Sequence, residues 1–223
     1  MKKTFKELKR EARVALKGKW GEGVLVIFIY VLFAFLCGLP SSYFEVTHPD
    51  YQTSIWKYMA QGTIFGFIIP TTLLSLFVQI PLSVGLDNSF RLLLGGNKDL
   101  TDNMFKLGFK NYWHNLGGML LVSLCVFLWS LLFIIPGIIK AFSYAMIPLV
   151  LVDNPELSCR EAMKRSQELM RGNKWRYFCL VLSFIGWILL GLLTLGIGYF
   201  WLFPYIYTTI GAFYNDLKVQ KGL

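Results

Sequence analysis

The chain has 223 residues, of which 55% are hydrophobic and 16% are charged, and its net charge is +9. Soluble domains carry about 45–50% apolar and about 25% charged residues, so this composition excludes an ordinary soluble globular protein. Uncharged runs at 63–86 and 116–139 are each longer than the about 20 residues that a helix needs to cross a bilayer. The sequence therefore predicts an all-α, polytopic integral membrane protein that forms one domain over 1–223.

The first predicted element is an amphipathic helix at 4–17. Thr4 and Glu7 have the spacing of a capping box, in which a hydroxyl and a carboxylate bind free backbone N–H groups. Gly18 is suited to end this helix in a left-handed conformation. Its basic face is expected to lie on the anionic inner leaflet; the alternative is that the helix only holds the next span at the right depth. The basic residues are Lys6, Lys9, Arg10, Arg13 and Lys17.

Six transmembrane spans are predicted, paired as three hairpins. They lie near 23–39, 63–86, 116–135, 138–152, 177–195 and 197–213. The stretch 116–152 would reach about 55 Å as one helix, against a hydrocarbon core of about 30 Å, and Pro136-Gly137 supplies a break. Gly196-Ile197-Gly198 divides the last stretch in the same way. No small-residue cleavage site follows the first span, so we expect it to be retained rather than removed as a signal peptide.

Basic residues orient the predicted spans. Of the 22, eight lie before residue 23, four in 87–115, six in 153–176 and two after 213. All of these fall on one predicted side of the membrane, whereas only Lys57 falls on the other. Short loops rich in Lys and Arg stay in the cytoplasm, so both termini are expected there. A nucleic-acid partner is not predicted, because no groove motif of basic and aromatic residues accompanies the charge.

A threefold repeat is predicted, in which each copy is a cytoplasmic amphipathic helix followed by a transmembrane hairpin. Ser158 and Glu161 repeat the capping box, and Gly172 follows them at the spacing of Gly18. The second copy is expected to have a shorter helix, because Gly108 would end it early. The helix of the third copy, 158–171, is expected to lie on lipid or to dock a partner protein; the alternative is that it only holds its hairpin at the right depth. The copies cover about 4–86, 99–152 and 158–214. The basic surface of the third helix consists of Lys164, Arg165, Arg171 and Lys174.

The later part of the chain resembles a known family through a set of proline, glycine and aromatic motifs. They are Pro136-Gly137-Ile138-Ile139-Lys140, Tyr144, Pro148, Asp153-Asn154-Pro155, Ala162, Gly172, Lys174-Trp175, Trp187, Gly196-Ile197-Gly198, Pro204-Tyr205 and Ala212-Phe213-Tyr214. The resemblance covers residues 1–20 and about 90–216. It is to an uncharacterised family of bacterial integral membrane proteins, catalogued as domain of unknown function nine-seven-five. It implies a fold and a place in the bacterial cytoplasmic membrane, but no activity.

A second, distant similarity concerns the plan of a hairpin preceded by a basic helix. This plan is similar to the membrane domain attached to some glycerophosphodiester phosphodiesterases. The catalytic domain of those enzymes does not occur in this sequence, so the similarity implies a membrane fold and no enzymatic activity.

Lys140 is the one Lys or Arg inside a predicted span, and an intramembrane charge is a candidate ligand group by default. Its ammonium would suit an anionic headgroup or a carboxylate. The alternative is that Lys140, just past Pro136, reaches the outer interface by snorkelling. Gln79 shares a polar face of the second span with Ser75, and this face either bonds to neighbouring helices or lines a solute path. The candidate ligand-binding residues are Lys140, Gln79 and Tyr144.

Enzyme, metal and cofactor chemistry is not predicted. His48 and His114 fall on opposite sides of the predicted membrane, and the four cysteines contain no CxxC pair. No HExxH, phosphate-binding glycine loop or GxSxG motif is present. No Asp or Glu lies deep in a predicted span, where most ion-coupled pumps carry one. The favoured hypothesis is a non-enzymatic module that binds membrane lipids or a partner protein. The second hypothesis is a small-solute or lipid transporter, which could be a homo-oligomer. The third is an intramembrane enzyme.

Overall fold

The computed structural model describes residues 2–47, 66, 69–97 and 99–222. Every regular element in these ranges is a helix, so the prediction of an all-α protein is confirmed. Five segments are long and apolar enough to cross a membrane: Trp20–Gly38, Ile69–Leu93, Tyr112–Leu132, Ile134–Asp153 and Lys174–Leu193. The sixth predicted span, 197–213, lies in α12 (Tyr199–Lys221), which is not among the five. Tyrosines and threonines between its apolar residues lower the hydropathy of α12.

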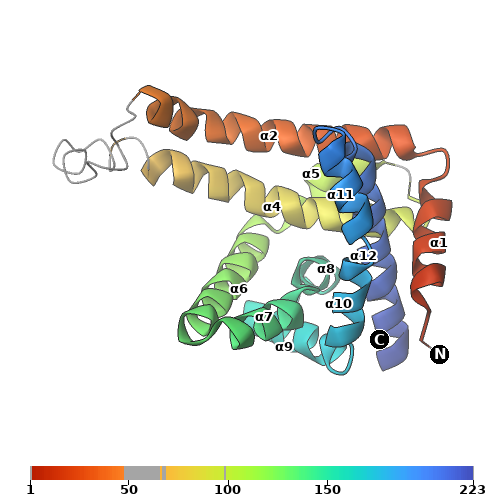
Figure 1. Cartoon of the computed structure of the whole chain (residues 1–223). Coiled ribbons are helices and arrows are strands. Elements are labelled where there is room, and N and C mark those ends of the chain that lie inside the picture. Colours follow the sequence, from red (N-terminus) through yellow and green to blue (C-terminus); the bar gives the residue numbers. More distant parts are fainter. Residues whose placement is uncertain (1, 48–65, 67–68, 98, 223) are drawn as a thin grey trace.

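The first hairpin consists of α2 (Trp20–Thr47) and α4 (Ile69–Leu93), which lie side by side (Figure 1). Helix α1 (Phe5–Leu16) precedes it. Helix α2 is longer than the predicted span 23–39, and the loop between the first two predicted spans therefore begins with helix up to Thr47. The rest of that loop, with His48 and Lys57, lies outside the described residues.

The second hairpin consists of α6 (Tyr112–Leu132), α7 (Ile134–Tyr144) and α8 (Ile147–Asp153). The position of its turn was predicted wrongly. The turn lies at Phe133 and not at Pro136-Gly137, because proline is tolerated in the first turn of a helix, where its missing N–H has no partner to lose. The predicted span 138–152 lies within the candidate segment Ile134–Asp153, in which a turn at 145–146 separates α7 from α8.

The third hairpin consists of α10 (Lys174–Leu182), α11 (Ile185–Leu193) and α12. The predicted span 177–195 is interrupted between α10 and α11. The Lys9 ammonium donates a hydrogen bond to the Ser183 carbonyl at the break (3.1 Å) and lies 4.1 Å from the centre of the Phe184 ring. The turn predicted at Gly196 is confirmed, with Gly196 at φ +90°.

The two capping boxes are confirmed. Helix α1 and helix α9 (Cys159–Met170) both have 12 residues, and each begins with the reciprocal pair of hydrogen bonds. Bonds from the Thr4 backbone N–H and hydroxyl hold the pKa of Glu7 below its usual value, and the Ser158 hydroxyl and N–H do the same for Glu161. Both helices are followed by a glycine in the left-handed region, at φ +78° and φ +80°. The threefold repeat of membrane hairpins stays a prediction.

Each short helix that precedes a hairpin packs on the last helices of another hairpin (Figure 1). Helix α5 (Leu100–Lys110) packs on α4, and α9 packs on α7 and α8. Helix α1 packs on α12, so the first helix of the chain contacts the last. Helix α4 also contacts α8 and α12. The short helices and the ends of the three hairpins therefore close into one body.

Glycines permit the closest of these contacts. A Cβ on Gly85 of α4 would overlap the Met104 carbonyl oxygen of α5, and a Cβ on Gly108 would lie 2.5 Å from the Pro81 carbonyl oxygen. Gly108 was predicted to end its helix, and this was wrong, because α5 continues to Lys110. The glycine instead lets the two backbones approach where any side chain would separate them.

A buried ionic network joins the ends of the three hairpins. Asp153 at the end of α8 pairs with Arg91 of α4 (2.5 Å) and with Lys218 of α12 (2.8 Å). It also accepts a hydrogen bond from the Tyr214 hydroxyl of α12 (3.0 Å). The side chains of Arg91 and Asp153 are only 12% and 13% exposed. One carboxylate thus holds α4, α8 and α12 together.

A second buried carboxylate, Asp216 of α12, fixes the N-terminus. Arg176 of α10 pairs with Asp216 (2.6 Å), and the Lys3 backbone N–H donates to the same carboxylate (3.4 Å). Arg176 also donates to the Lys3 carbonyl. These bonds set α1 in place along α12.

Two acidic residues lie near the ends of the apolar segments, which does not contradict the prediction that none lies deep in a span. The second candidate span extends to Leu93 and not to residue 86, so it includes Asp87, and the fourth ends with Asp153. The predicted boundary failed because α4 continues past its apolar run into a part that is buried by α5, α8 and α12 rather than by lipid.

The glycine contact predicts that Gly85→Ala separates α4 from α5. We expect the free energy of unfolding in detergent to fall by about 1–3 kcal/mol or more, as for other overpacked sites. Gly21→Ala is the matched control, because a Cβ at Gly21 meets nothing within 4 Å. Equal stability of the two variants in a denaturant titration would contradict the packing of α5 on α4.

The ionic network predicts that Asp153→Asn destabilises the fold strongly, because two buried or half-buried cations would lose their partner. Removing one member of a buried ion pair costs about 3–5 kcal/mol of unfolding free energy. Asp102→Asn is the control, because Asp102 pairs with Lys106 on the open surface of α5, where ion pairs contribute little. A loss at Asp153 no larger than the loss at Asp102 would show that the network does not hold the hairpins together.

Candidate functional site

A basic pocket of about 420 Å³ lies between α7, α9 and the start of α10. Four of its lining side chains are cations contributed by three different elements. They are Lys140 of α7, Lys164 of α9, Arg171 at the end of α9 and Lys174 of α10. Ser143, Gln167 and Glu168 complete the lining. The pocket therefore carries a large excess of positive charge.

None of the four cations forms an ion pair with another described residue. Glu168, the acidic side chain at the rim, lies 3.7 Å from Arg165, which does not line the pocket. Cations that converge without partners repel one another and raise the local concentration of anions. A carboxylate or phosphate in this position would accept charge-assisted hydrogen bonds from several of them.

Side-chain bonds between α7 and α9 build the pocket. The Ser166 hydroxyl donates to the Ser143 carbonyl (2.9 Å), and the Gln167 amide donates to the Tyr144 hydroxyl (3.0 Å). Helix α9 buries Ala162, Ser166, Leu169 and Met170 on one face. This docking turns Lys164 and Arg171, which are seven residues apart on one helical face, towards Lys140.

Lys140 is held within reach of the α9 cations. Its Nζ lies 4.9 Å from the centre of the Trp129 ring and 5.9 Å from that of Tyr144. Lys140 and the α9 cations line one pocket because α7 ends at Tyr144, one helical turn beyond Lys140, and α9 packs on α7. The choice between a ligand role and snorkelling stays a prediction.

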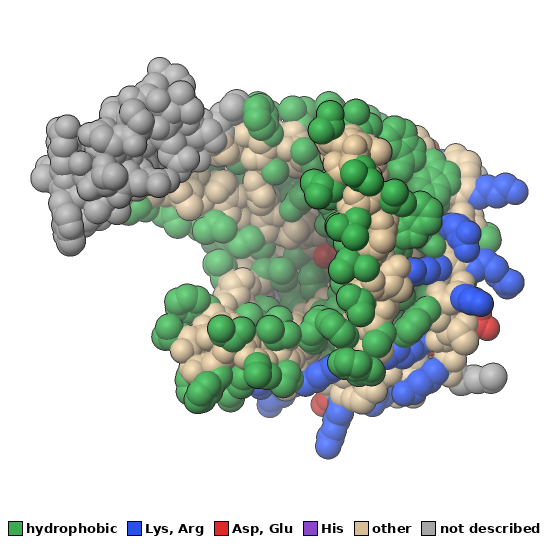
Figure 2. Space-filling view, viewed as in Figure 1, with side chains coloured by type: hydrophobic (Ala, Val, Ile, Leu, Met, Phe, Trp, Pro, Cys, Tyr) green, Lys and Arg blue, Asp and Glu red, His purple; other side chains and the backbone are tan. Residues whose placement is uncertain are grey.

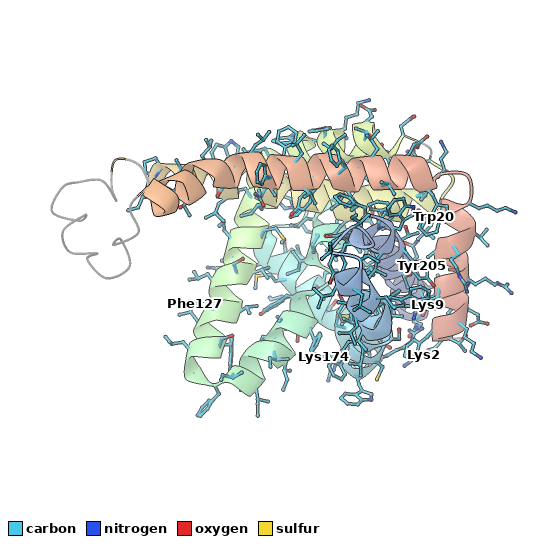
Figure 3. The ribbon with its side chains drawn as sticks, turned by 45° about the horizontal axis from the view of Figure 1, so that its top comes forward. Lys2, Lys9, Trp20, Phe127, Lys174 and Tyr205 are labelled. Atoms are coloured by element: carbon cyan, nitrogen blue, oxygen red, sulfur yellow. The ribbon has the colours of Figure 1, made fainter. Side chains whose placement is uncertain are left out.

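An apolar pocket adjoins the basic one and shares Lys174 with it. It has a volume of about 270 Å³, and its other lining residues are Ile138, Ile139, Phe142, Trp175 and Phe178. Its aromatic wall is formed by Phe142 against Phe178, with the Trp175 ring tilted against Phe178 at 5.1 Å between ring centres. Lys174, labelled in Figure 3, stands between the two pockets. Together they match a ligand that has a charged end and an apolar end.

The other predicted site residues lie elsewhere. Tyr144 contacts the basic pocket through Gln167, but Gln79 is in α4 and does not line it. Ser75, on the same face as Gln79, donates to a backbone carbonyl of its own helix. The Lys9 ammonium binds the Ser183 carbonyl at the break between α10 and α11, and burial lowers the pKa of Lys9. Lys6, Arg10, Arg13 and Lys17 belong to α1, away from this pocket.

Sequence reasoning missed Ser143 and Gln167 and did not connect Lys140 with the basic residues of α9. The helical spacing of Lys164, Gln167, Arg171 and Lys174 was visible, but no local pattern shows which helix this face meets. Within the described ranges, no group of three or more His, Cys, Asp or Glu could hold a metal ion. The four cysteines are free thiols.

Comparison with known proteins finds a family that matches part of the chain. The family described as "Protein of unknown function (DUF975)" matches residues 119–221, which confirms the family resemblance over that range. The range contains all four cations of the basic pocket. It does not include residues 1–20, and similarity to the membrane domain of glycerophosphodiester phosphodiesterases is not shown. No curated protein and no solved structure matches the chain.

Proposed function

We propose that this chain, whose residues 119–221 match the DUF975 family, is a non-enzymatic, multi-pass protein of the bacterial cytoplasmic membrane that binds an anionic lipid in its basic pocket. The observation that carries this proposal is the convergence of four unpaired cations beside an apolar pocket. A phosphate headgroup would bind the cations, and the first part of an acyl chain would lie against Phe142 and Phe178.

A lipid fits these pockets better than a soluble anion. A small soluble anion would leave the adjoining apolar pocket empty, whereas a lipid fills both parts and removes apolar surface from water. Both pockets lie at the start of α10, which belongs to a candidate span, so lipid headgroups would be at the same depth. The Ser143 hydroxyl donates to the Ile139 carbonyl (2.7 Å), so it is not paired with a base for nucleophilic catalysis.

The distribution of charge supports a cytoplasmic position of the basic surface. Figure 2 shows Lys and Arg side chains along one flank and the lower edge of the molecule, whereas the surface over α2 is hydrophobic. The positive-inside rule places such a basic region in the cytoplasm, together with both termini. Each Lys or Arg near the anionic inner leaflet contributes roughly 1 kcal/mol of attraction, so anionic lipids are then the expected partners.

Six spans are part of this proposal. Five are the candidate segments described above, and α12 would be the sixth, returning from the turn at Leu195. Helix α12 is shielded by its neighbours α1, α2, α4 and α11, so it needs less hydropathy than a helix that faces lipid on all sides.

Thiol labelling tests the topology. In a variant without the native cysteines, we expect Asn97→Cys to react with a membrane-impermeant maleimide only in inside-out vesicles. Leu195→Cys is expected to react only in intact spheroplasts, because Leu195 lies at the α11–α12 turn and is 94% exposed. Reaction of both positions from the cytoplasmic side would show that the third hairpin does not cross the membrane.

Native mass spectrometry of the protein in lipid nanodiscs tests the lipid site. We expect the wild type to retain phosphatidylglycerol over phosphatidylcholine, and Lys140→Gln and Lys164→Gln each to weaken that retention about tenfold, because a hydrogen bond to a charged group is lost. Lys106→Gln is the matched control, since Lys106 lies on exposed α5 and outside the pocket.

Two results would contradict the lipid proposal. One is equal retention of the anionic and the zwitterionic lipid by the wild type. The other is equal loss of lipid in all three lysine variants, which would indicate general charge attraction instead of a defined pocket.

A further inference from the structure

We propose a second ligand site, in a groove between α1, α11 and α12, that binds a long-chain carboxylate with its head at Arg13 and its chain along the two hairpin helices. The groove has a volume of about 400 Å³, within the range of small-ligand pockets. This site shares no lining residue with the basic pocket, so it is independent of the lipid proposal above.

The walls of the groove come from equivalent faces of two antiparallel helices. One wall is formed by Trp187, Leu190 and Gly191 of α11 with Thr194 just after its end, and the other by Gly198 just before α12 with Trp201, Leu202 and Tyr205. Trp20, the first residue of α2, completes the lining beside Arg13. Both sets follow the spacing i, i+3, i+4, i+7, which defines one face of a helix. Because the two faces meet at the turn, they form a continuous apolar trough that runs from the hairpin tip towards α1.

Glycines give this trough its depth. A Cβ on Gly198 would lie 2.7 Å from the Thr194 hydroxyl oxygen and 3.2 Å from the Gly191 Cα. The helices therefore touch backbone to backbone near the turn, and the larger side chains Trp187 and Trp201 stand at the sides. An extended hydrocarbon chain fits a trough of this shape, whereas a bulky polar ligand would find no hydrogen-bonding partner for most of its length.

Arg13 supplies the charge at the α1 end. It is exposed on α1, makes no ion pair with a described residue, and lies close enough to Tyr205 to affect it electrostatically. Figure 3 shows Trp20, Tyr205 and Lys9 on the flank where α1 meets α12. No acidic residue lines the groove. A guanidinium can bind a carboxylate through two parallel hydrogen bonds, so the end of the trough matches a single anionic head.

The contrast with the basic pocket identifies the ligand class. Four cations line the basic pocket, whereas Arg13 is the one cation among the described residues that line this groove. A ligand with a single negative charge would neutralise Arg13. The lining side chains Trp187, Leu190 and Trp201 are themselves exposed, so a chain would enter the groove from the lipid phase. Three tryptophans at the groove suit a chain whose head lies at the membrane interface.

Fluorescence quenching tests this site directly. In a variant in which Trp56, Trp113, Trp129 and Trp175 are replaced by Phe, the remaining tryptophans are the three at the groove. A brominated long-chain fatty acid added to this variant in nanodiscs is expected to quench the fluorescence in a saturable manner. Arg13→Gln in the same background should raise the half-saturating concentration about five- to tenfold, because the charge-assisted bonds to the head are lost.

Matched variants separate the groove from general effects. Arg10→Gln removes an arginine of α1 that lines a different pocket, and it should leave the half-saturating concentration unchanged. Leu190→Phe should obstruct the trough, whereas Leu189→Phe, its exposed neighbour outside the groove, should not. Quenching that does not saturate would overturn the proposal, and so would equal half-saturating concentrations for Arg13→Gln and Arg10→Gln. Either result would show that the fatty acid only surrounds the protein as annular lipid. Loss of the anionic lipid in Lys140→Gln would leave this result unaffected.

Discussion

The carboxylate of Asp153 is the point on which the arrangement of the hairpins depends. It lies at the end of α8, among residues that are otherwise mainly apolar, and it is balanced by Arg91 from α4 and Lys218 from α12. A carboxylate taken out of water without such partners would be costly, so its presence there requires that all three helix ends meet. The Tyr214 hydroxyl occupies a further acceptor position and closes the network.

The short helices owe their positions to this junction. Helices α5, α9 and α1 each pack on a helix that the junction holds, and each lies on a hairpin other than the one it precedes. Both proposed ligand sites form at such crossings. At α9, the crossing sets three surface cations against Lys140; at α1, it sets one arginine at the open end of an apolar groove. The same architecture thus yields two sites that differ in charge.

Local rules succeeded wherever the physical cause is contained in a few neighbouring residues. The capping boxes at Thr4 and Ser158 and the turn at Gly196 depend on hydrogen bonds and φ angles within one helical turn, and they were predicted correctly. The rules failed where a residue has two possible uses. Pro136 was predicted to form a turn, but it lies in the first turn of α7. Gly108 was predicted to end its helix, but it allows α5 to pack closely on α4.

The sequence by itself determined the all-α class, the apolar segments and the starts of α1 and α9, because lipid solvation and capping act on contiguous residues. Only the tertiary structure decided that α1 packs on α12, that Asp153 joins three hairpins, and that Lys140 faces Lys164 and Arg171. These are contacts between distant segments. A helical face in the sequence shows which side chains point together, but its partner is chosen by the packing of the whole chain.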